Sequence, residues 1–419
     1  MNHSANSLPT SHPRYAVSAE WMCDGSGKSF QRDATVIVED DRIVDIIFPS
    51  QQITPSSELV IYRFEGATLV PGLIDAHVHL TLDPSVRDLI QDHADTSDEQ
   101  LFDRSIRNAG EALAAGVTTV RDLGGRNDVC FKVKAAIQKE LCRGPHLQVA
   151  GRPLTCLRGH LYYMGGEVST TEDAIRLIRR QAERGADLTK VVATGGGLTP
   201  GTGLMRAQFS SRELAAIVSE SHHLGLPVAA HVGWGPAIRA CAECAVDTLE
   251  HCTFITPTGL LIDETVLEIV RERRPYIVTT KYQFLLNKDR TETFGNLKAE
   301  VDRTFAQMYE DTLVQLARFR EVGLKVVAGS DAGIVGMQFS GVIGEIKMLE
   351  LAGYPPVEAL AAATGIAAGA LHVDDDRGIV RKGFRADLLV VRGPVHESTD
   401  HLRHTLLVIK DGRISYQAN

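Results

Sequence analysis

The chain has 419 residues, of which 44% are hydrophobic and 23% charged, and its formal net charge is −9. This length suits one large domain with an appendage, or two or three smaller domains. The composition is that of a folded globular protein and excludes a wholly disordered chain. A mildly acidic chain without a basic block is not expected to bind nucleic acid or an anionic membrane surface.

The N-terminus and the cysteines bear on localisation. Residues 1–15 are rich in Asn, Ser, Pro and His and have no apolar core, which predicts a disordered lead rather than a signal peptide. No apolar run reaches the roughly 18 residues of a membrane span. Seven cysteines, an odd number, do not make a disulfide framework. We therefore expect a cytoplasmic protein that does not bind membranes.

The middle of the chain alternates strand-like runs with amphipathic helical segments. The helical segments include 98–115, 171–184 and 211–224. Eight such units are typical of a (β/α)8 TIM barrel, predicted over residues 67–377. A doubly wound open sheet is the alternative, but Gly195-Gly196-Gly197 lacks the spacing of a nucleotide-binding fingerprint. The eight strand-like runs are 73–80, 117–123, 146–150, 189–193, 227–231, 248–251, 276–281 and 325–330.

The two ends of the chain contain short apolar runs separated by turn residues. In the first segment, 35–38 and 42–47 flank an Asp-Asp turn; in the second, 387–391 and 405–410 precede an Asp-Gly turn and the run 413–416. Hairpin-type turns between apolar runs predict a small β-domain. We expect residues 16–66 and 378–419 to pair into one sandwich-like β-domain beside the barrel.

Polar side chains fall at or near the ends of five predicted barrel strands. Because reactive groups of barrels lie at the carboxyl ends of the strands, these side chains are expected to converge. Each residue taken singly has a structural explanation. A histidine can be a hydrogen-bonded core residue, a lysine can lie at a sheet edge, and an aspartate can cap a helix. Together they favour one polar site. The residues are His77 and His79, which share one face of their strand, then Lys190, His231, His251 and Asp331.

Imidazole and carboxylate groups are the ligands that Zn²⁺ and its first-row neighbours prefer. Lys190 is costly on a core strand as a bare ammonium, but CO₂ would convert it into an anionic carbamate able to bridge two metals. Two metals about 3.5–4 Å apart can share a hydroxide and polarise a carbonyl. Asp331 could bind a metal, take the proton of the shared water and pass it to the leaving amine.

The chain resembles the amidohydrolase superfamily of metal-dependent hydrolases over nearly its whole length. The resemblance lies in PGLIDAHVHL, KVVATGGG, AAHVG, LEHC, GSDAG and the C-terminal GFRADLLVV and VIKDGRI. Lys190 and the RGHLYYMGG segment resemble the prolidase-like branch, which hydrolyses Xaa-Pro, Xaa-Arg or Xaa-Lys dipeptides and ochratoxin-type amides.

The resemblance implies a binuclear zinc site with N6-carboxylysine at Lys190. His77, His79 and Asp331 would then hold one metal, His231 and His251 the other, and Lys190 would bridge them. The expected activity is cleavage of an amide bond in a small carboxylate-bearing molecule, a dipeptide or N-acyl amino acid. Barrels of this kind commonly self-associate, so a homo-oligomer is expected.

Further residues are candidates for contacts with the substrate. His160 follows the third strand and could donate a hydrogen bond to the scissile carbonyl oxygen or to the oxyanion, as a second catalytic residue beside Asp331. Tyr162 and Tyr163 replace the glycine-rich loop usual in the branch after this histidine. Tyr282 could donate to a substrate carboxylate, and Lys281 or Arg121 could pair with it. An internal ion pair with Asp122 is the simpler reading of Arg121.

Three other functions stay open. A metal-free scaffold protein would be expected to lack some ligands, whereas all six positions are filled. A mononuclear deaminase or an imidazolonepropionase-like hydrolase of cyclic amides would not need Lys190. A lactone, carbamate or phosphotriester hydrolase could use the same metal site, since the same hydroxide attacks those centres.

Overall fold

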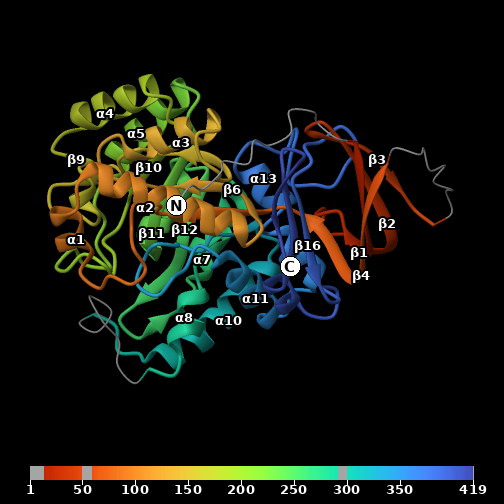
Figure 1. The fold of residues 1–419 in the computed structure, drawn as a ribbon. Coiled ribbons are helices and arrows are strands. Elements are labelled where there is room, and N and C mark those ends of the chain that lie inside the picture. Colours follow the sequence, from red (N-terminus) through yellow and green to blue (C-terminus); the bar gives the residue numbers. More distant parts are fainter. Residues whose placement is uncertain (1–13, 50–58, 291–299, 419) are drawn as a thin grey trace.

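The computed structural model describes residues 14–49, 59–290 and 300–418 (Figure 1). Its strands are β1 (Tyr15–Cys23), β2 (Phe30–Glu39), β3 (Arg42–Ile47), β4 (Val60–Pro71), β5 (Leu73–Val78), β6 (Val117–Asp122), β7 (His146–Val149), β8 (Thr155–Cys156), β9 (Glu167–Val168), β10 (Thr189–Val192), β11 (Val228–Trp234), β12 (Thr248–Thr256), β13 (Gly259–Leu260), β14 (Tyr276–Thr279), β15 (Val326–Ala328), β16 (Leu388–Arg392), β17 (Thr405–Lys410) and β18 (Arg413–Gln417).

Its α-helices are α1 (Leu89–Asp95), α2 (Asp98–Ala114), α3 (Val129–Gln138), α4 (Thr171–Glu183), α5 (Ser211–His223), α6 (Gly235–Glu243), α7 (Glu264–Arg273), α8 (Tyr282–Asn287), α10 (Phe305–Glu321), α11 (Val342–Leu351), α12 (Pro356–Ala361) and α13 (Gly365–Ala370). Two short 3-10 helices, η1 (Tyr162–Met164) and η2 (Thr399–Arg403), complete the described elements.

The middle of the chain is an α/β fold with parallel sheets, as the alternating pattern predicts. Each of the eight strand-like runs overlaps a strand. These strands form two parallel sheets, ordered β5-β6-β7 and β10-β11-β12-β14-β15. Isolated parallel bridges lie between the edges of the two sheets, at Val78 with Ala332 and at Leu154 with Val191.

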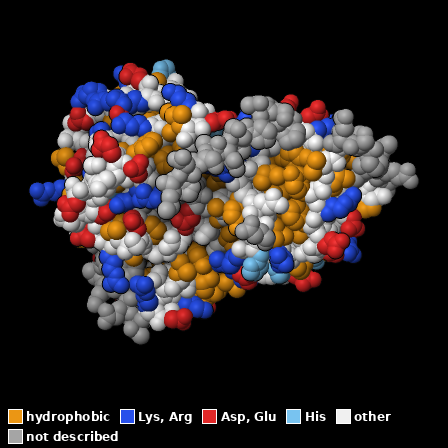
Figure 2. Space-filling model, in the orientation of Figure 1, with side chains coloured by type: hydrophobic (Ala, Val, Ile, Leu, Met, Phe, Trp, Pro, Cys, Tyr) orange, Lys and Arg blue, Asp and Glu red, His pale blue; other side chains and the backbone are white. Residues whose placement is uncertain are grey.

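The three predicted helical segments form α2, α4 and α5, each within one residue of its expected ends. Each begins with a capping box. The Ser or Thr side chain at the N-cap accepts a hydrogen bond from the backbone amide of the third helical residue, and the side chain of that third residue accepts one from the N-cap backbone amide. Apolar residues at helical spacing then bury one face of the helix against the sheets. In Figure 2 charged side chains of both signs are spread over this helical part.

The two ends of the chain pair into one sheet, ordered β18-β17-β16-β4-β1-β2-β3. The strands of the N-terminal and C-terminal segments share this sheet in Figure 1 because β16 pairs antiparallel with β4. The seven strands are joined in one continuous sheet rather than in two separate facing sheets. Residues 1–13 of the predicted lead lie outside the described residues, but Tyr15, its last residue, is buried in β1.

The predicted boundary between the β-domain and the barrel, at residues 66 and 67, falls inside β4. Only Gly72 separates β4 from β5, so the terminal sheet runs almost directly into the strand that carries His77. A Cβ at Gly72 would lie 2.2 Å from the Thr118 hydroxyl oxygen, which leaves room for glycine alone. The domain boundaries themselves stay a prediction.

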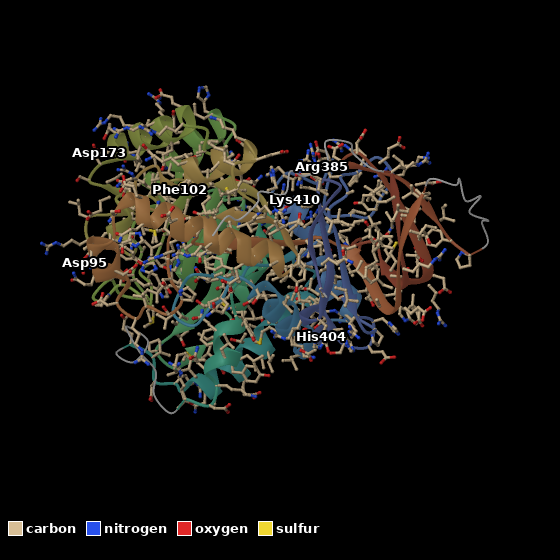
Figure 3. The ribbon with its side chains drawn as sticks, viewed as in Figure 1. Asp95, Phe102, Asp173, Arg385, His404 and Lys410 are labelled. Atoms are coloured by element: carbon tan, nitrogen blue, oxygen red, sulfur yellow. The ribbon has the colours of Figure 1, made fainter. Side chains whose placement is uncertain are left out.

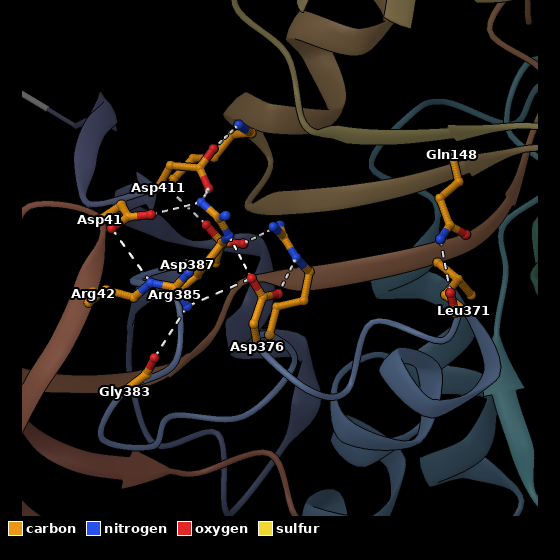
Figure 4. Close-up of polar contacts among 11 residues, drawn as sticks. Asp41, Arg42, Gln148, Leu371, Asp376, Gly383, Arg385, Asp387 and Asp411 are labelled. Atoms are coloured by element: carbon orange, nitrogen blue, oxygen red, sulfur yellow. Dashed lines mark hydrogen bonds and ion pairs between the residues drawn. The ribbon is translucent and has the colours of Figure 1, made fainter. Parts of the chain in front are cut away.

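A network of ion pairs joins the two terminal segments near their junction with the α/β part (Figure 4). Arg385 contacts Asp41 at 2.9 Å, Asp376 at 2.8 Å and Asp411 at 3.2 Å, while Arg377 contacts buried Asp387 at 2.9 Å. Figure 3 places Arg385 and Lys410 between the two parts of the molecule. Partly buried networks of this kind fix the relative placement of segments distant in sequence.

Among the helices of the described residues, none has both the length and the apolarity needed to cross a membrane.

A buried carboxyl group beneath β14 should make stability depend on pH. Burial raises the pKa of Glu345, on α11, from its usual 4.5 to about 8. The native state then holds a proton that the unfolded state releases, so the free energy of unfolding should fall as pH rises from about 4.5 to about 8. Glu345→Gln should flatten this slope by on the order of 1 kcal/mol per pH unit. Denaturant unfolding of both proteins across that range checks this, and parallel pH curves would contradict it.

Candidate metal centre

One cavity opens at the carboxyl ends of the parallel strands and contains all six predicted ligand side chains. Its polar lining consists of these residues with His160, Gln283, Thr253 and the glycines 195–197 and 233. Its apolar wall is formed by Leu82, Leu161, Leu198, Leu204, Ile255, Leu260, Phe284 and Ile334.

His77, His79 and Asp331 form the tightest cluster. The Nε2 atoms of His77 and His79 lie 3.3 Å and 3.5 Å from Oδ1 of Asp331. Hydrogen bonds between the two backbones, from the Asp331 amide to His77 O at 2.7 Å and from the His79 amide to Ala332 O at 2.9 Å, fix this register. Among the described residues this group has the spacing to hold a metal ion. Burial would raise the pKa of Asp331, but His77 and His79 hold it below its usual range.

His231 and His251 extend this cluster across the cavity. Their ring centroids lie 4.5 Å apart, and that of His251 lies 4.9 Å from that of His77. Burial lowers the pKa of both His231 and His251, so their rings are neutral and can offer a lone pair to a metal. His251 adopts a positive φ of 70° within β12, and its Nδ1 lies 2.6 Å from Thr280 Oγ1.

Lys190 lies on β10 at the base of the cavity and is fully buried. Among the described residues its Nζ has no hydrogen-bond partner, although an unpaired buried ammonium is costly. Burial lowers the pKa of Lys190 to about 8, which makes a neutral amine accessible. A neutral amine is the form that reacts with CO₂, so an orphaned lysine among four imidazoles and a carboxylate fits a carbamate that binds metals.

Glu250 is a functional candidate that the sequence reasoning missed. Its Oε2 accepts from His77 Nδ1 at 2.8 Å, and its Oε1 accepts from Arg121 at 2.9 Å and from Thr248 Oγ1 at 2.5 Å. Burial would raise the pKa of Glu250, but Arg121 and His77 hold it at about 2. In the neutral His77 ring, a carboxylate at Nδ1 favours the proton on that nitrogen, so Nε2 has the lone pair that a metal ligand requires.

Arg121 does not line the cavity and pairs with Glu250 instead. Its guanidinium lies beneath the cavity, where it also donates to Ala76 O at 2.7 Å. The expected ion pair is internal, but its partner is Glu250 and not Asp122. Asp122 accepts instead from the Leu80 and Gly124 amides at 2.9 Å. A pair of opposite charges on two apolar strands, Arg121 and Glu250, is the sequence signal that could have revealed this.

His160 lines the cavity as expected, with its ring centroid 4.7 Å from that of His231. Tyr162, Tyr163 and Tyr282 do not line it. Leu161 has a positive φ of 63°, which turns the chain into η1 and places Tyr163 against His93, with Tyr162 packed edge-on against Tyr163.

The residues after β14 also lie elsewhere than predicted. The strand ends at Thr279, and Tyr282 begins α8, so the alternation of a strand no longer governs them. The Tyr282 hydroxyl accepts from Arg403 at 3.2 Å. Lys281 is fully buried and donates to Gln315 at 3.5 Å, outside the cavity lining.

If His77 binds a metal, Glu250→Gln should weaken that binding, probed with added zinc, by about 10- to 100-fold, because a neutral amide orients His77 less strongly than a carboxylate. Competition with a chelator measures the zinc affinity. Glu250→Gln also leaves the Arg121 cation unpaired in the core, which would lower the free energy of unfolding whether or not metal binding changes.

The control is the double variant Arg121→Met with Glu250→Gln. It should recover stability, because the unpaired cation is gone, while zinc binding stays weak. Recovery of both would show that Glu250 serves folding alone.

Similarity to known proteins identifies the family of this chain. The amidohydrolase family matches residues 68–414. An ochratoxinase of Aspergillus niger is 27% identical over 419 residues, covering 90% of this chain and 80% of the relative.

Two solved structures share the fold. A crystal structure of a Xaa-Pro dipeptidase with bound methionine has a TM-score of 0.85 at 23% identity, covering 97% of this chain and all of that one. The A. niger ochratoxinase structure has a TM-score of 0.83 at 23% identity, covering 97% and 96%. The resemblance seen in the sequence is thus confirmed: the chain belongs to the amidohydrolase family and is a hydrolase acting on carbon–nitrogen bonds.

Proposed function

We propose that this protein is a binuclear zinc-dependent hydrolase that cleaves an amide bond of a small carboxylate-bearing molecule. One observation carries the proposal: four histidines, Asp331 and the orphaned Lys190 Nζ converge on one buried cavity. A scaffold protein has no use for a buried lysine without a partner. A mononuclear deaminase or ring hydrolase does not need this lysine either.

We infer that the two parallel sheets close into a (β/α)8 barrel around this cavity. The Val78–Ala332 and Leu154–Val191 bridges support this, because they lie where the sheet edges must meet. The amides of Leu154 and Val192 add hydrogen bonds to Lys190 O and Leu154 O at 2.8 Å. Closure would place the eight strand ends at one mouth.

His77, His79 and Asp331 would hold one metal, His231 and His251 the second, and carboxylated Lys190 would join them. When bound, the metals supply Lewis-acid activation of water and of the scissile carbonyl. The Asp331 carboxylate accepts a proton from the attacking water and delivers it to the leaving amine. His160 donates a hydrogen bond to the carbonyl oxygen as negative charge develops there. The apolar wall excludes bulk water and strengthens both interactions.

The relatives support the substrate class. They include an ochratoxinase and a Xaa-Pro dipeptidase, and a dipeptidase cleaves the amide bond of a dipeptide. In the substrate, the group beside the scissile bond would pack on Leu204, Ile255, Leu260 and Phe284, which form one apolar cluster. An aromatic or branched aliphatic side chain suits that surface.

A neutral amide or carbamate is the second candidate, and the lining favours it in one respect. Lys190 is the single lysine or arginine among the described cavity residues, since Arg121 and Lys281 lie outside. A substrate carboxylate would then depend on the metals or on neutral donors such as Gln283.

A substrate panel with zinc measured on the same sample tests the proposal. The panel contains N-acyl amino acids and dipeptides with apolar side chains, their C-terminal amides, cyclic amides, carbamates, lactones and a phosphotriester. We expect release of an amino acid from the carboxylate-bearing amides and two zinc ions per chain. Faster cleavage of the neutral amides would select the second candidate. One zinc per chain with full turnover would exclude the binuclear site.

A further inference from the structure

Two side chains of α10 hold the hairpin that carries part of the apolar wall. Strand β12 turns back into the two-residue strand β13, with Ile255 opposite Leu260, and both residues line the cavity. A ladder this short does not fix a hairpin by itself, so the position of the hairpin depends on what packs behind it. Asp311 and Gln315, four residues apart on one face of α10, make that contact.

Both backbone polar groups of Leu260 are bonded to these two side chains. The Leu260 amide donates to Asp311 Oδ2 at 3.0 Å, and Gln315 Nε2 donates to Leu260 O at 2.8 Å. Gln315 Nε2 also donates to Thr253 O, on β12, at 2.6 Å. A Cβ at Gly259 would lie 2.6 Å from Asp311 Oδ2, so the helix lies directly against the turn. The two side chains thus take the place of a neighbouring strand along β13.

Gln315 fits its surroundings as an amide and not merely by its size. Its side chain is 1% exposed, and its Oε1 accepts from Lys281 Nζ at 3.5 Å. A lysine ammonium can only donate and backbone carbonyls can only accept, so one orientation of the amide satisfies all three contacts. Lys281 also begins α8, where its carbonyl oxygen accepts from the Phe284 amide at 2.9 Å. Gln315 therefore links the hairpin to the helix that carries Phe284, another residue of the apolar wall.

We propose that Asp311 and Gln315 are positioning residues that set the substrate preference of the cavity by fixing its apolar wall from behind. The proposal rests on the proposed function, in which the group beside the scissile bond packs on this wall. Ile255 and Leu260 share one apolar cluster with residues of α10, so the wall and the helix are packed together. A wall held through its backbone is already shaped when substrate arrives, and burial of apolar surface there favours large apolar groups over small ones.

Two pairs of amides measured on the zinc enzyme test the proposal. In each pair phenylalanine replaces glycine, on the acyl side of the scissile bond or on the amine side. In Gln315→Met the larger native preference for phenylalanine, taken as a ratio of kcat/KM values, should fall about tenfold, mainly through a higher KM. Zinc content should be unchanged. Partial unfolding would lower the amount of active enzyme and reduce both kcat/KM values equally, which leaves their ratio in place.

Variants on the same helix give the controls. Thr312, also buried on α10, donates to Met308 O within the helix at 2.8 Å, so Thr312→Val should leave the preference at its native value. Asp311→Asn keeps an oxygen for the Leu260 amide and should retain the preference, whereas Asp311→Leu should lower it. An unchanged preference in Gln315→Met or Asp311→Leu, an equal loss in Thr312→Val, or a native enzyme without the preference would overturn the proposal.

Trp234 reports on the wall without turnover. It packs against the same apolar cluster and lies opposite Ile255 in the parallel ladder, and Trp21 is the other of the two tryptophans. In a Trp21→Phe background, Trp234 emission measures binding of benzyl alcohol, an apolar probe with neither an amide nor a carboxylate. Gln315→Met should weaken this binding about tenfold, because the probe buries less apolar surface on a displaced wall.

Failure of the proposed function gives a different result from failure of this proposal. If no amide is cleaved, the proposed function is wrong, and the affinity for benzyl alcohol then decides the role of α10. Benzyl alcohol that does not bind the Trp21→Phe protein, or binds equally well after Gln315→Met, would overturn that role.

Discussion

Asp331→Asn is expected to lower kcat by about three orders of magnitude, the middle of the range for losing a general acid–base group. The asparagine amide can contact the same neighbours but cannot carry the proton between water and leaving group. The backbone is the reason to choose asparagine. Asp331 has a positive φ of 57°, a conformation that Asn adopts readily and that alanine resists.

The measurement pairs steady-state kinetics with zinc analysis of the same sample, since Asp331 is also a proposed ligand. Asp331→Ala is the comparison that should add a loss of thermal stability from backbone strain. If Asp331→Asn with full zinc keeps a tenth or more of the native kcat, another group carries the proton.

Lys190→Met is expected to leave the protein with fewer than two zinc ions and to lower kcat by about a thousandfold, since bound metals supply most of the electrostatic stabilisation. Methionine fills similar volume without a bridging anion. The metal-free variant should also unfold at higher denaturant concentration than the metal-free native protein, because an unpaired buried ammonium has been removed. Metal analysis, native mass spectrometry for the added CO₂ and denaturant unfolding are the three readouts.

Lys281→Met is the matched control for this variant. Both lysines are fully buried and burial lowers the pKa of each to about 8, but Lys281 contacts Gln315 outside the cavity lining. Its replacement should leave the zinc content at the native value. Two zinc ions in Lys190→Met would contradict the bridging role, whereas equal zinc loss in both variants would point to a general effect of replacing a buried lysine.

The arrangement of the α/β part could be predicted because its signals are local. Apolar runs with helix caps between them mark strands and helices, and the strand-end rule then brings His77, His231 and Asp331 to one place. Local turn residues also predict strands at both chain ends, and one shared sheet is the simplest assembly of those strands. The length of β4 could not be seen, because exposed polar residues such as Arg63 and Glu65 interrupt its apolar pattern.

The residues that surround the ligands could not be predicted, because they depend on geometry rather than pattern. Glu250 reaches His77 from a strand that is distant in sequence, and Thr199 reaches His160 from a separate loop. Of the predicted substrate contacts, His160 lines the cavity, whereas Tyr162, Tyr163 and Tyr282 lie outside the lining, where regular structure stops. Leu161 turns the chain in a left-handed conformation, and β14 ends before Lys281, so strand alternation no longer tells where these side chains point.

The near continuity of β4 and β5 also has a consequence for folding during synthesis. β4 gains its neighbour β16 only after residue 388 has left the ribosome, and β4 is separated from the strand of His77 by Gly72 alone. A nascent chain therefore carries its first histidine pair long before the sheet that anchors that strand is complete. The strand that carries this histidine pair therefore continues from a strand whose partner β16 comes from a segment synthesised more than 300 residues later.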